Sequence, residues 1–135
     1  MTKNCTNLEQ SKKFIELGID LNTADMCISL FTITTNGNKE IKQVLLPLNY
    51  SKVTEYPAPD FIERFPAWSL SALLGLMPTD DKKDEYYVDT ESHSDYHTVS
   101  YRNCWDGCIH SEYSKESLLD GAFEMIVWLK ENGKI

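Results

Sequence analysis

The sequence of 135 residues has no long hydrophobic run. A membrane-spanning helix needs about 20 consecutive apolar residues, and no stretch of the chain approaches that length. The first residues, MTKNCTNLEQSKKF, also lack the apolar segment of a secretory signal peptide. We therefore expect no membrane partner and a cytoplasmic location. Because thiols are kept reduced in that compartment, we expect the four cysteines to be reduced.

Positive charge is also scarce. The chain has 13 lysines and arginines against 21 aspartates and glutamates, which gives a formal net charge of −8. This balance works against binding to phosphate backbones or to anionic lipid. No basic patch is interleaved with aromatic residues, as it is in many nucleic-acid-binding domains. We therefore expect no direct binding of nucleic acid, whereas a basic protein partner would suit the charge.

Common catalytic signatures are missing as well. The chain has neither a glycine-rich phosphate-binding loop nor the Gly-x-Ser-x-Gly turn of many hydrolases. We expect no cofactor, and we favour a binding protein over an enzyme. The composition is otherwise that of an ordinary globular protein, with 41% hydrophobic and 25% charged residues. A chain of this length is enough for one domain, so we expect a single domain over residues 1–135.

The first third of the sequence predicts a helix followed by a hairpin. Thr6 or Asn7 can cap a helix over about 8–17, because Glu9 and Gln10 complete the spacing of a capping box. Gly18 suits the position just after the helix. Strand-like runs at 27–34 and 40–46 then flank Asn36-Gly37, which is the strongest short signal for a hairpin turn.

The middle of the chain predicts a loop and a short helix. Residues 49–64 contain Pro57 and Pro59 and are interpreted as loop. The uncharged block FPAWSLSALLGLMP at 65–78 contains a helix over about 70–77, capped by Ser69. Its leucines fall on one face, which favours a helix of the protein's own core over a docking surface.

The last third predicts three strands and a long helix. The strands are expected at 85–90, 95–105 and 108–113, with a hairpin turn at Asp106-Gly107. The final helix begins after Ser114 or Ser117 and ends at Asn132-Gly133. Its apolar residues cover more than half of its circumference, which indicates a central helix. The predicted order is α-β-β-α-β-β-β-α: an α+β fold in which an antiparallel sheet of about five strands, a hairpin plus a meander, packs on three helices.

Three blocks carry a resemblance. LEQSKKFIELGIDLNTADM at 8–26, FPAWSLSALLGLMP at 65–78 and SLLDGAFEMIVWLKENGKI at 117–135 resemble a family of small uncharacterised proteins of gut bacteria, their phages and other mobile elements. The resemblance implies a cytoplasmic protein of mobile-element origin. It implies no activity, because the family has no catalytic motif to transfer. The matching blocks coincide with the predicted helices, so they are interpreted as determinants of the fold.

One cluster has residue types that could carry chemistry. Its members are the thiols and imidazoles of Cys104, Cys108, His97 and His110. Four such ligands can hold zinc, but His97 and Cys104 would point to opposite faces of a regular strand. A cysteine–histidine nucleophilic pair across the hairpin is a second interpretation. Both make a thiol- or zinc-dependent enzyme the alternative to a binding protein.

Two further groups of residues are candidates for binding. Tyrosine and tryptophan are enriched at protein interfaces, and the predicted meander contains Tyr86, Tyr96, Tyr101 and Trp105. If the helices cover one face of the sheet, we expect a tyrosine-rich face on the other side. The acidic stretch from residue 80 to 95 begins with Asp80, Asp81, Asp84 and Glu85. We expect a non-catalytic protein-binding or regulatory protein that binds a partner or itself, with an acidic mimic of DNA as a further alternative.

Overall fold

The structure is a computed structural model, and it describes residues 4–47, 61–78, 86–103, 109–115 and 117–135. Contacts between residues divide the chain into two compact units, Asn7–Ser69 and a second unit of Met1–Thr6 with Leu70–Ile135. Each unit is described by itself. The single domain over residues 1–135 stays a prediction.

Both units combine helices with antiparallel sheets, so the predicted α+β class is confirmed. The described residues of the first unit form α1 (Leu8–Leu17), the 3-10 helix η1 (Leu21–Thr23), β1 (Met26–Thr35), β2 (Asn38–Leu46) and β3 (Phe61–Ala67). Those of the second unit form α2 (Leu70–Gly75), β4 (Tyr86–Ser92), β5 (His97–Asn103), β6 (Ile109–Lys115) and α3 (Leu118–Glu131). In the described part of the chain, the strands form two sheets of three, with the orders β2-β1-β3 and β4-β5-β6. The prediction of one sheet of about five strands is corrected on this point, although the hairpin and the meander are both present.

Helix α1 has the predicted boundaries. The Asn7 side chain accepts a hydrogen bond from the Gln10 N–H at 2.8 Å, and the Asn7 N–H donates to Gln10 Oε1 at 3.0 Å. This reciprocal pair is the capping box that the sequence indicated. Gly18 ends the helix with a φ of 77°, a conformation that favours glycine.

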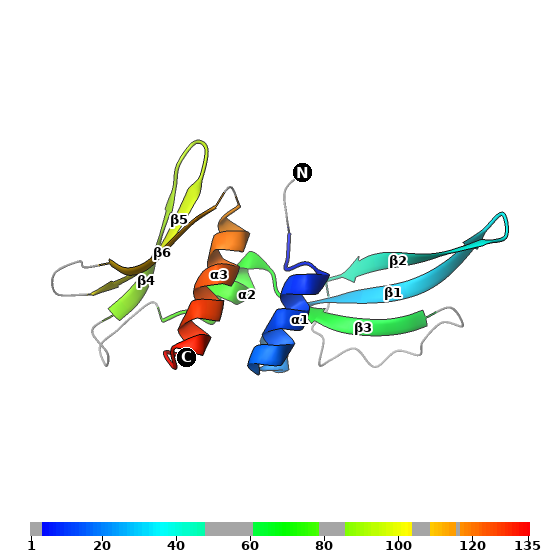
Figure 1. Cartoon of the computed structure of the whole chain (residues 1–135), viewed down its shortest axis with the longest axis horizontal. Helices are drawn as coiled ribbons and strands as arrows, with labels where there is room; N and C mark the ends of the chain where they lie inside the picture. The colour runs from blue at the N-terminus through cyan, green and yellow to red at the C-terminus, as the bar shows by residue number, and fades with distance from the viewer. Residues whose placement is uncertain (1–3, 48–60, 79–85, 104–108, 116) are drawn as a thin grey trace. The chain divides into compact units, whose positions relative to one another are not determined.

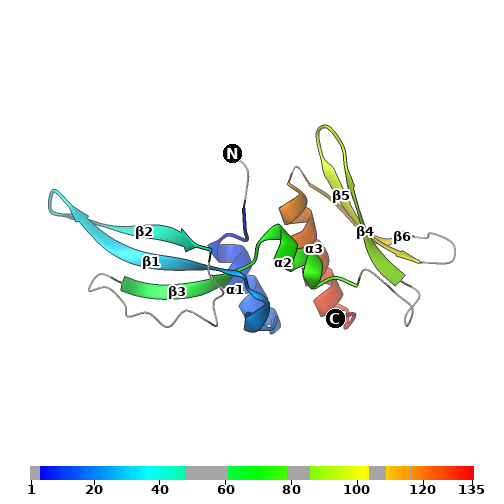
Figure 2. The same cartoon turned by 180° about the vertical axis from the view of Figure 1, so that it is seen from behind.

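The β1–β2 hairpin is also confirmed. Asn36 and Gly37 have φ angles of 51° and 82°, so both turn residues adopt the left-handed conformation of a type I′ turn. The two strands pair without a register shift from Thr35↔Asn38 to Cys27↔Leu46. Figures 1 and 2 both place α1 at the end of the sheet where β1 begins, and the hairpin turn at the opposite end.

Strand β3 is a correction to the prediction that residues 49–64 form a loop. Residues 61–64 belong to β3, which pairs antiparallel with β1 and has a register shift between Leu30 and Phe31. The loop prediction was therefore wrong at residues 61–64, whereas its other residues, including Pro57 and Pro59, lie outside the described residues. The strand also contains a proline, Pro66. Among the described residues, β3 pairs with β1 alone and so lies at an edge of the sheet, a position in which proline is tolerated.

The core of the first unit gathers where α1 packs on β3. Phe14 and Trp68 are fully buried and meet edge to face, with ring centroids 5.0 Å apart. The Trp68 Nε1–H donates to Thr23 Oγ1 at 2.9 Å. The Ser69 hydroxyl and N–H both donate to the carboxylate of Asp25. The predicted core role of the 65–78 block is therefore confirmed at Trp68.

The second unit packs α3 against β5 and β6, with α2 against α3. The buried residues of α3 are Leu119, Gly121, Ala122, Phe123, Met125, Ile126 and Leu129, which confirms the broad apolar face. Ser117 caps this helix, since its hydroxyl accepts from the Asp120 N–H at 3.4 Å. Helix α2 ends at Gly75, short of the predicted residue 77, although Leu73 and Met77 are both buried. The predicted Asp106-Gly107 turn lies outside the described residues.

Candidate functional site

Three of the eight predicted binding residues lie in the described part of the chain: Tyr86, Tyr96 and Tyr101. The remaining five lie outside it, and they are Asp80, Asp81, Asp84, Glu85 and Trp105. The structure therefore bears on the tyrosines and on the last part of the acidic stretch.

Tyr101 lies on the side of the sheet that faces α3. Its ring stacks on Tyr86 with centroids 5.2 Å apart and lies 5.4 Å from the Trp128 ring of α3. Only 4% of Tyr101 is exposed. Tyr101 thus belongs to the core on the helix side, whereas we expected it on an uncovered tyrosine-rich face. Strand alternation instead places Tyr87, Asp89, Thr98, Ser100 and Arg102 on the opposite face.

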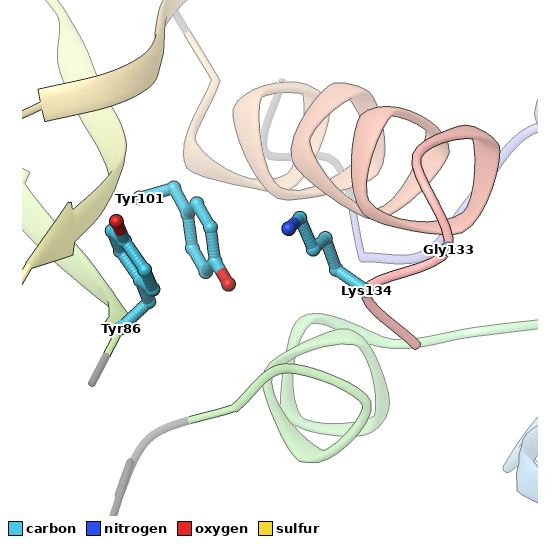
Figure 3. Close-up of a pocket in the computed structure, with 4 residues that line it drawn as sticks. All are labelled: Tyr86, Tyr101, Gly133 and Lys134. Carbon is cyan, nitrogen blue, oxygen red and sulfur yellow. The ribbon is translucent and has the colours of Figure 1, made fainter. Parts of the chain in front are cut away.

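Tyr86 and Tyr101 also line a pocket of about 290 Å³ with Gly133 and Lys134. Figure 3 shows the two tyrosine rings side by side, with the Lys134 side chain reaching toward them from the C-terminal end. An ammonium group beside aromatic rings can hold a small anionic or aromatic group.

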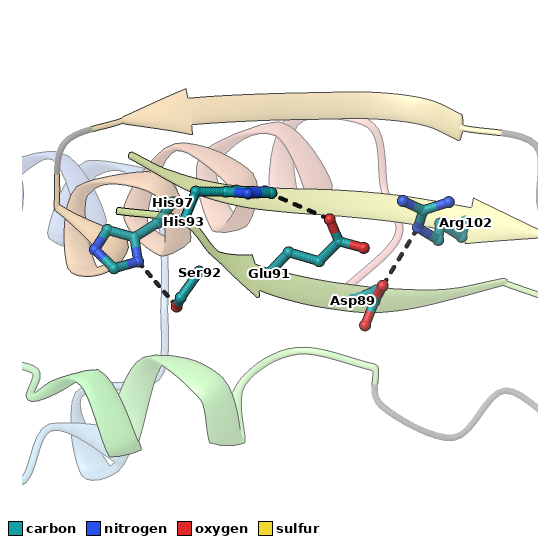
Figure 4. Close-up of polar contacts among 6 residues, drawn as sticks. All are labelled: Asp89, Glu91, Ser92, His93, His97 and Arg102. Atoms are coloured by element: carbon teal, nitrogen blue, oxygen red, sulfur yellow. Dashed lines mark hydrogen bonds and ion pairs between the residues drawn. The ribbon is translucent and has the colours of Figure 1, made fainter. Parts of the chain in front are cut away.

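Tyr96 is the exposed member of the group, with an exposed fraction of 44%. It lies in the turn between β4 and β5, where the His93 N–H donates to the Tyr96 carbonyl at 2.8 Å. The Tyr96 ring stacks on His93 with centroids 4.4 Å apart. This stack gives the turn a flat aromatic surface beside Glu91, whose Oε2 is 3.6 Å from His93 Nε2 (Figure 4).

Of the four side chains in the predicted thiol and zinc cluster, the structure describes that of His97 alone. His97 Nδ1 lies 2.9 Å from the Ser92 hydroxyl, across the ends of β4 and β5 (Figure 4). Cys104, Cys108 and the side chain of His110 lie outside the described residues. Within the described ranges, no group of three or more histidine, cysteine or acidic side chains could hold a metal ion. The zinc site and the cysteine–histidine pair stay predictions.

In the described part of the acidic stretch, two carboxylates lie close to an arginine or a histidine side chain of the same chain. Asp89 Oδ2 lies 3.4 Å from Arg102 Nε, and Glu91 lies beside His93 (Figure 4). Asp89 therefore has the Arg102 guanidinium as a local counter-charge. An acidic mimic of DNA stays a prediction that depends on residues 80–85.

The sequence analysis missed a different surface, the open edge of β2. Eight of its nine residues are exposed, and Leu46 is the exception. Ile41 is 68% exposed, and Val44 and Leu45 are exposed as well. In the part of the chain that the structure describes, β2 pairs with β1 on one side and with no strand on the other. The available signal was the mixture of Lys39, Glu40 and Lys42 with apolar residues, because natural edge strands often carry charges.

No helix within the described ranges is long and apolar enough to cross a membrane. Comparison of the chain with protein-family models, with curated proteins and with solved structures found no match. The resemblance of the three sequence blocks to a mobile-element family stays a prediction.

Proposed function

We propose that this chain is a non-catalytic protein-binding protein and that the open edge of β2, residues Asn38–Leu46, is its contact surface. The observation that carries the proposal is the exposure of this strand. Three large apolar side chains, Ile41, Val44 and Leu45, are exposed along a strand that pairs on one side only among the described residues.

An open edge offers a partner both affinity and specificity. The unpaired N–H and C=O groups of an edge strand can accept a further strand, which adds main-chain hydrogen bonds. The side chains that alternate along β2 then contact those of the added strand, which gives specificity. Lys39, Glu40 and Lys42 supply charges of both signs along the strand, and Ile41 supplies an apolar contact between them.

The rest of the first unit is suited to presenting such a strand. The type I′ turn at Asn36-Gly37 fixes the register of β2 against β1. Phe14 and Trp68 anchor the other end of the sheet, near α1. The exposed strand is thus held on a sheet with a packed base, which lowers the entropy cost of ordering it on binding.

Site-specific photo-crosslinking in the native host tests the proposal. A photoreactive residue replaces Ile41 in one sample and Ile15 in a matched control. Ile15 is an isoleucine of α1 that is 41% exposed, so the control tests exposure alone. We expect one discrete covalent adduct from position 41 and none from position 15. No adduct from position 41, or equal adducts from both positions, would contradict the proposal.

A further inference from the structure

We infer that the partner strand of β2 is β2 of a second copy of this chain, paired antiparallel about a two-fold axis that passes through Ile41. The inference rests on the proposed function. It is carried by two properties of β2: the backbone groups that face its open edge and the order of its charges.

The hairpin determines which residues of β2 direct their backbone N–H and C=O groups away from β1, toward the open edge. In an antiparallel pair, opposite residues alternate between those that exchange hydrogen bonds and those that do not. The pair that closes a two-residue turn, here Thr35↔Asn38, exchanges hydrogen bonds, and no register shift follows along β2. Glu40, Lys42 and Val44 therefore direct their N–H and C=O groups toward β1. The residues that direct theirs to the open edge are Lys39, Ile41, Gln43 and Leu45.

Two-fold symmetry then restricts the possible registers. When a strand pairs with its own copy, residue i opposes residue j and residue j opposes residue i. Hydrogen bonds between the two copies of β2 form only where a residue with its backbone groups at the open edge opposes another such residue of the second copy. Because these residues alternate along the strand, the two-fold axis must pass through a residue and cannot pass between two residues. The possible centres in the middle of β2 are Glu40, Ile41, Lys42 and Gln43.

The charges distinguish these four registers. A centre at Glu40 or at Lys42 places that residue opposite its own copy, and like charges directly opposite each other are destabilising. A centre at Gln43 places Lys42 opposite Val44 and leaves no ion pair. A centre at Ile41 places Glu40 opposite Lys42 of the other copy, and it does so twice. The charges of Glu40 and Lys42 therefore disfavour the registers centred on those two residues and favour the register centred on Ile41.

In the Ile41 register, both the hydrogen-bonded and the non-hydrogen-bonded pairs bring favourable side chains together. Ile41 opposes its own copy in a hydrogen-bonded pair, so two isoleucines that are each 68% exposed come together. Glu40 and Lys42 oppose each other in a non-hydrogen-bonded pair, in which the two Cα atoms are only about 4.5 Å apart and the side chains are closer. Opposite-charge pairs in this position are favourable. Since one strand pair is smaller than a standard interface of about 1,600 Å², we expect a reversible dimer.

Charge reversal with the full-length protein tests the register by sedimentation velocity over a range of concentrations. Glu40→Lys alone and Lys42→Glu alone each place like charges opposite each other twice, so we expect each to weaken dimerisation by about tenfold or more. The double variant Glu40→Lys/Lys42→Glu restores opposite charges and should dimerise like the parent. A mixture of the two single variants should form a heterodimer, because every opposed pair is then complementary.

Disulfide trapping supplies a second, independent measurement. A hydrogen-bonded antiparallel pair separates Cα atoms by about 5.5 Å, which lies within the range that a disulfide can span. Under oxidation, Ile41→Cys should give a covalent dimer above the background of the parent chain. Gln43→Cys should not, because Gln43 opposes Lys39 in this register, and neither should the surface control Ile15→Cys.

The results separate the failure of this inference from the failure of the proposed function. A parent chain that stays monomeric at all concentrations would overturn the inference. The register would be overturned if neither single charge reversal weakened dimerisation. It would also be overturned if Gln43→Cys gave a disulfide-linked dimer and Ile41→Cys did not. If the chain is monomeric while position 41 still crosslinks to a different protein, the function stands with another partner. If position 41 crosslinks to nothing, the proposed function fails as well.

Discussion

The rings of Phe14 and Trp68 meet edge to face, with centroids 5.0 Å apart and planes inclined at 74°. Both side chains are fully buried, and they join α1 to the end of β3. We expect Phe14→Ala to lower the free energy of unfolding by about 3–5 kcal/mol, because it leaves a cavity beside the indole. Ile15→Ala, at an exposed neighbouring position, should change it by less than about 0.5 kcal/mol. Urea unfolding measures both, and equal effects would show that this pair is not part of the core.

The indole of Trp68 also needs a hydrogen-bond acceptor. Its Nε1–H donates to Thr23 Oγ1 at 2.9 Å, and Trp68 is fully buried. Thr23→Val keeps the shape of the side chain but removes this acceptor together with the hydrogen bond that the hydroxyl donates to the Asp20 carbonyl, which should cost about 1–3 kcal/mol of unfolding free energy. Thr35→Val is the matched control, since Thr35 is exposed near the hairpin turn. A loss at Thr23 no larger than that at Thr35 would argue against this hydrogen bond.

Substitution by alanine should destabilise the protein at one of two glycines and not at the other. Gly37 has a φ of 82° in the hairpin turn, so Gly37→Ala should destabilise the protein by about 1 kcal/mol although no atom lies within 4 Å of the added carbon. Gly75 lies in α2 with equally open space around it, and there alanine is the better helix former. Gly75→Ala should leave the unfolding midpoint unchanged or raise it. A higher midpoint for Gly37→Ala would contradict the turn assignment.

The elements that the sequence predicted well are those with a local physical cause. The capping box at Asn7 and the pair Asn36-Gly37 each determine backbone conformation within a few residues. The start of strand β3 was missed because residues 61–64 were assigned to a loop on the evidence of Pro57 and Pro59, and their pairing with β1 joins segments about 35 residues apart. The division of the strands into two sheets likewise depends on pairing between distant segments.

The candidate site was harder to predict for the same reason. Alternation along β5 correctly separates Tyr101 from Ser100, but it cannot say which side receives α3. The Tyr101–Trp128 contact answers that question and places Tyr101 in the core. The exposure of Ile41 depends on the lack of a further strand beside β2 among the described residues, which no local pattern encodes.

The thiol hypothesis and the binding hypothesis differ in what Cys104→Ser/Cys108→Ser would do. These cysteines lie outside the described residues, and the proposed contact surface is on β2. We therefore expect the double variant to keep the crosslink from position 41 at the yield of the parent chain. Elemental analysis of the purified parent and variant provides the second readout. Stoichiometric zinc in the parent that disappears in the variant would favour a metal-dependent protein.

Amide hydrogen exchange resolves the proposed pairing residue by residue. In the monomer, the amides of Lys39, Ile41 and Gln43 face the open edge and should exchange rapidly, whereas those of Glu40 and Lys42 are bonded to β1. Raising the protein concentration should slow exchange at the first group, because those amides bond to the second copy. Glu40→Lys should abolish that slowing at the same concentration. Slowing that is uniform along β2, or that persists in Glu40→Lys, would mean that the strand is protected by something other than β2 of a second copy in the Ile41 register.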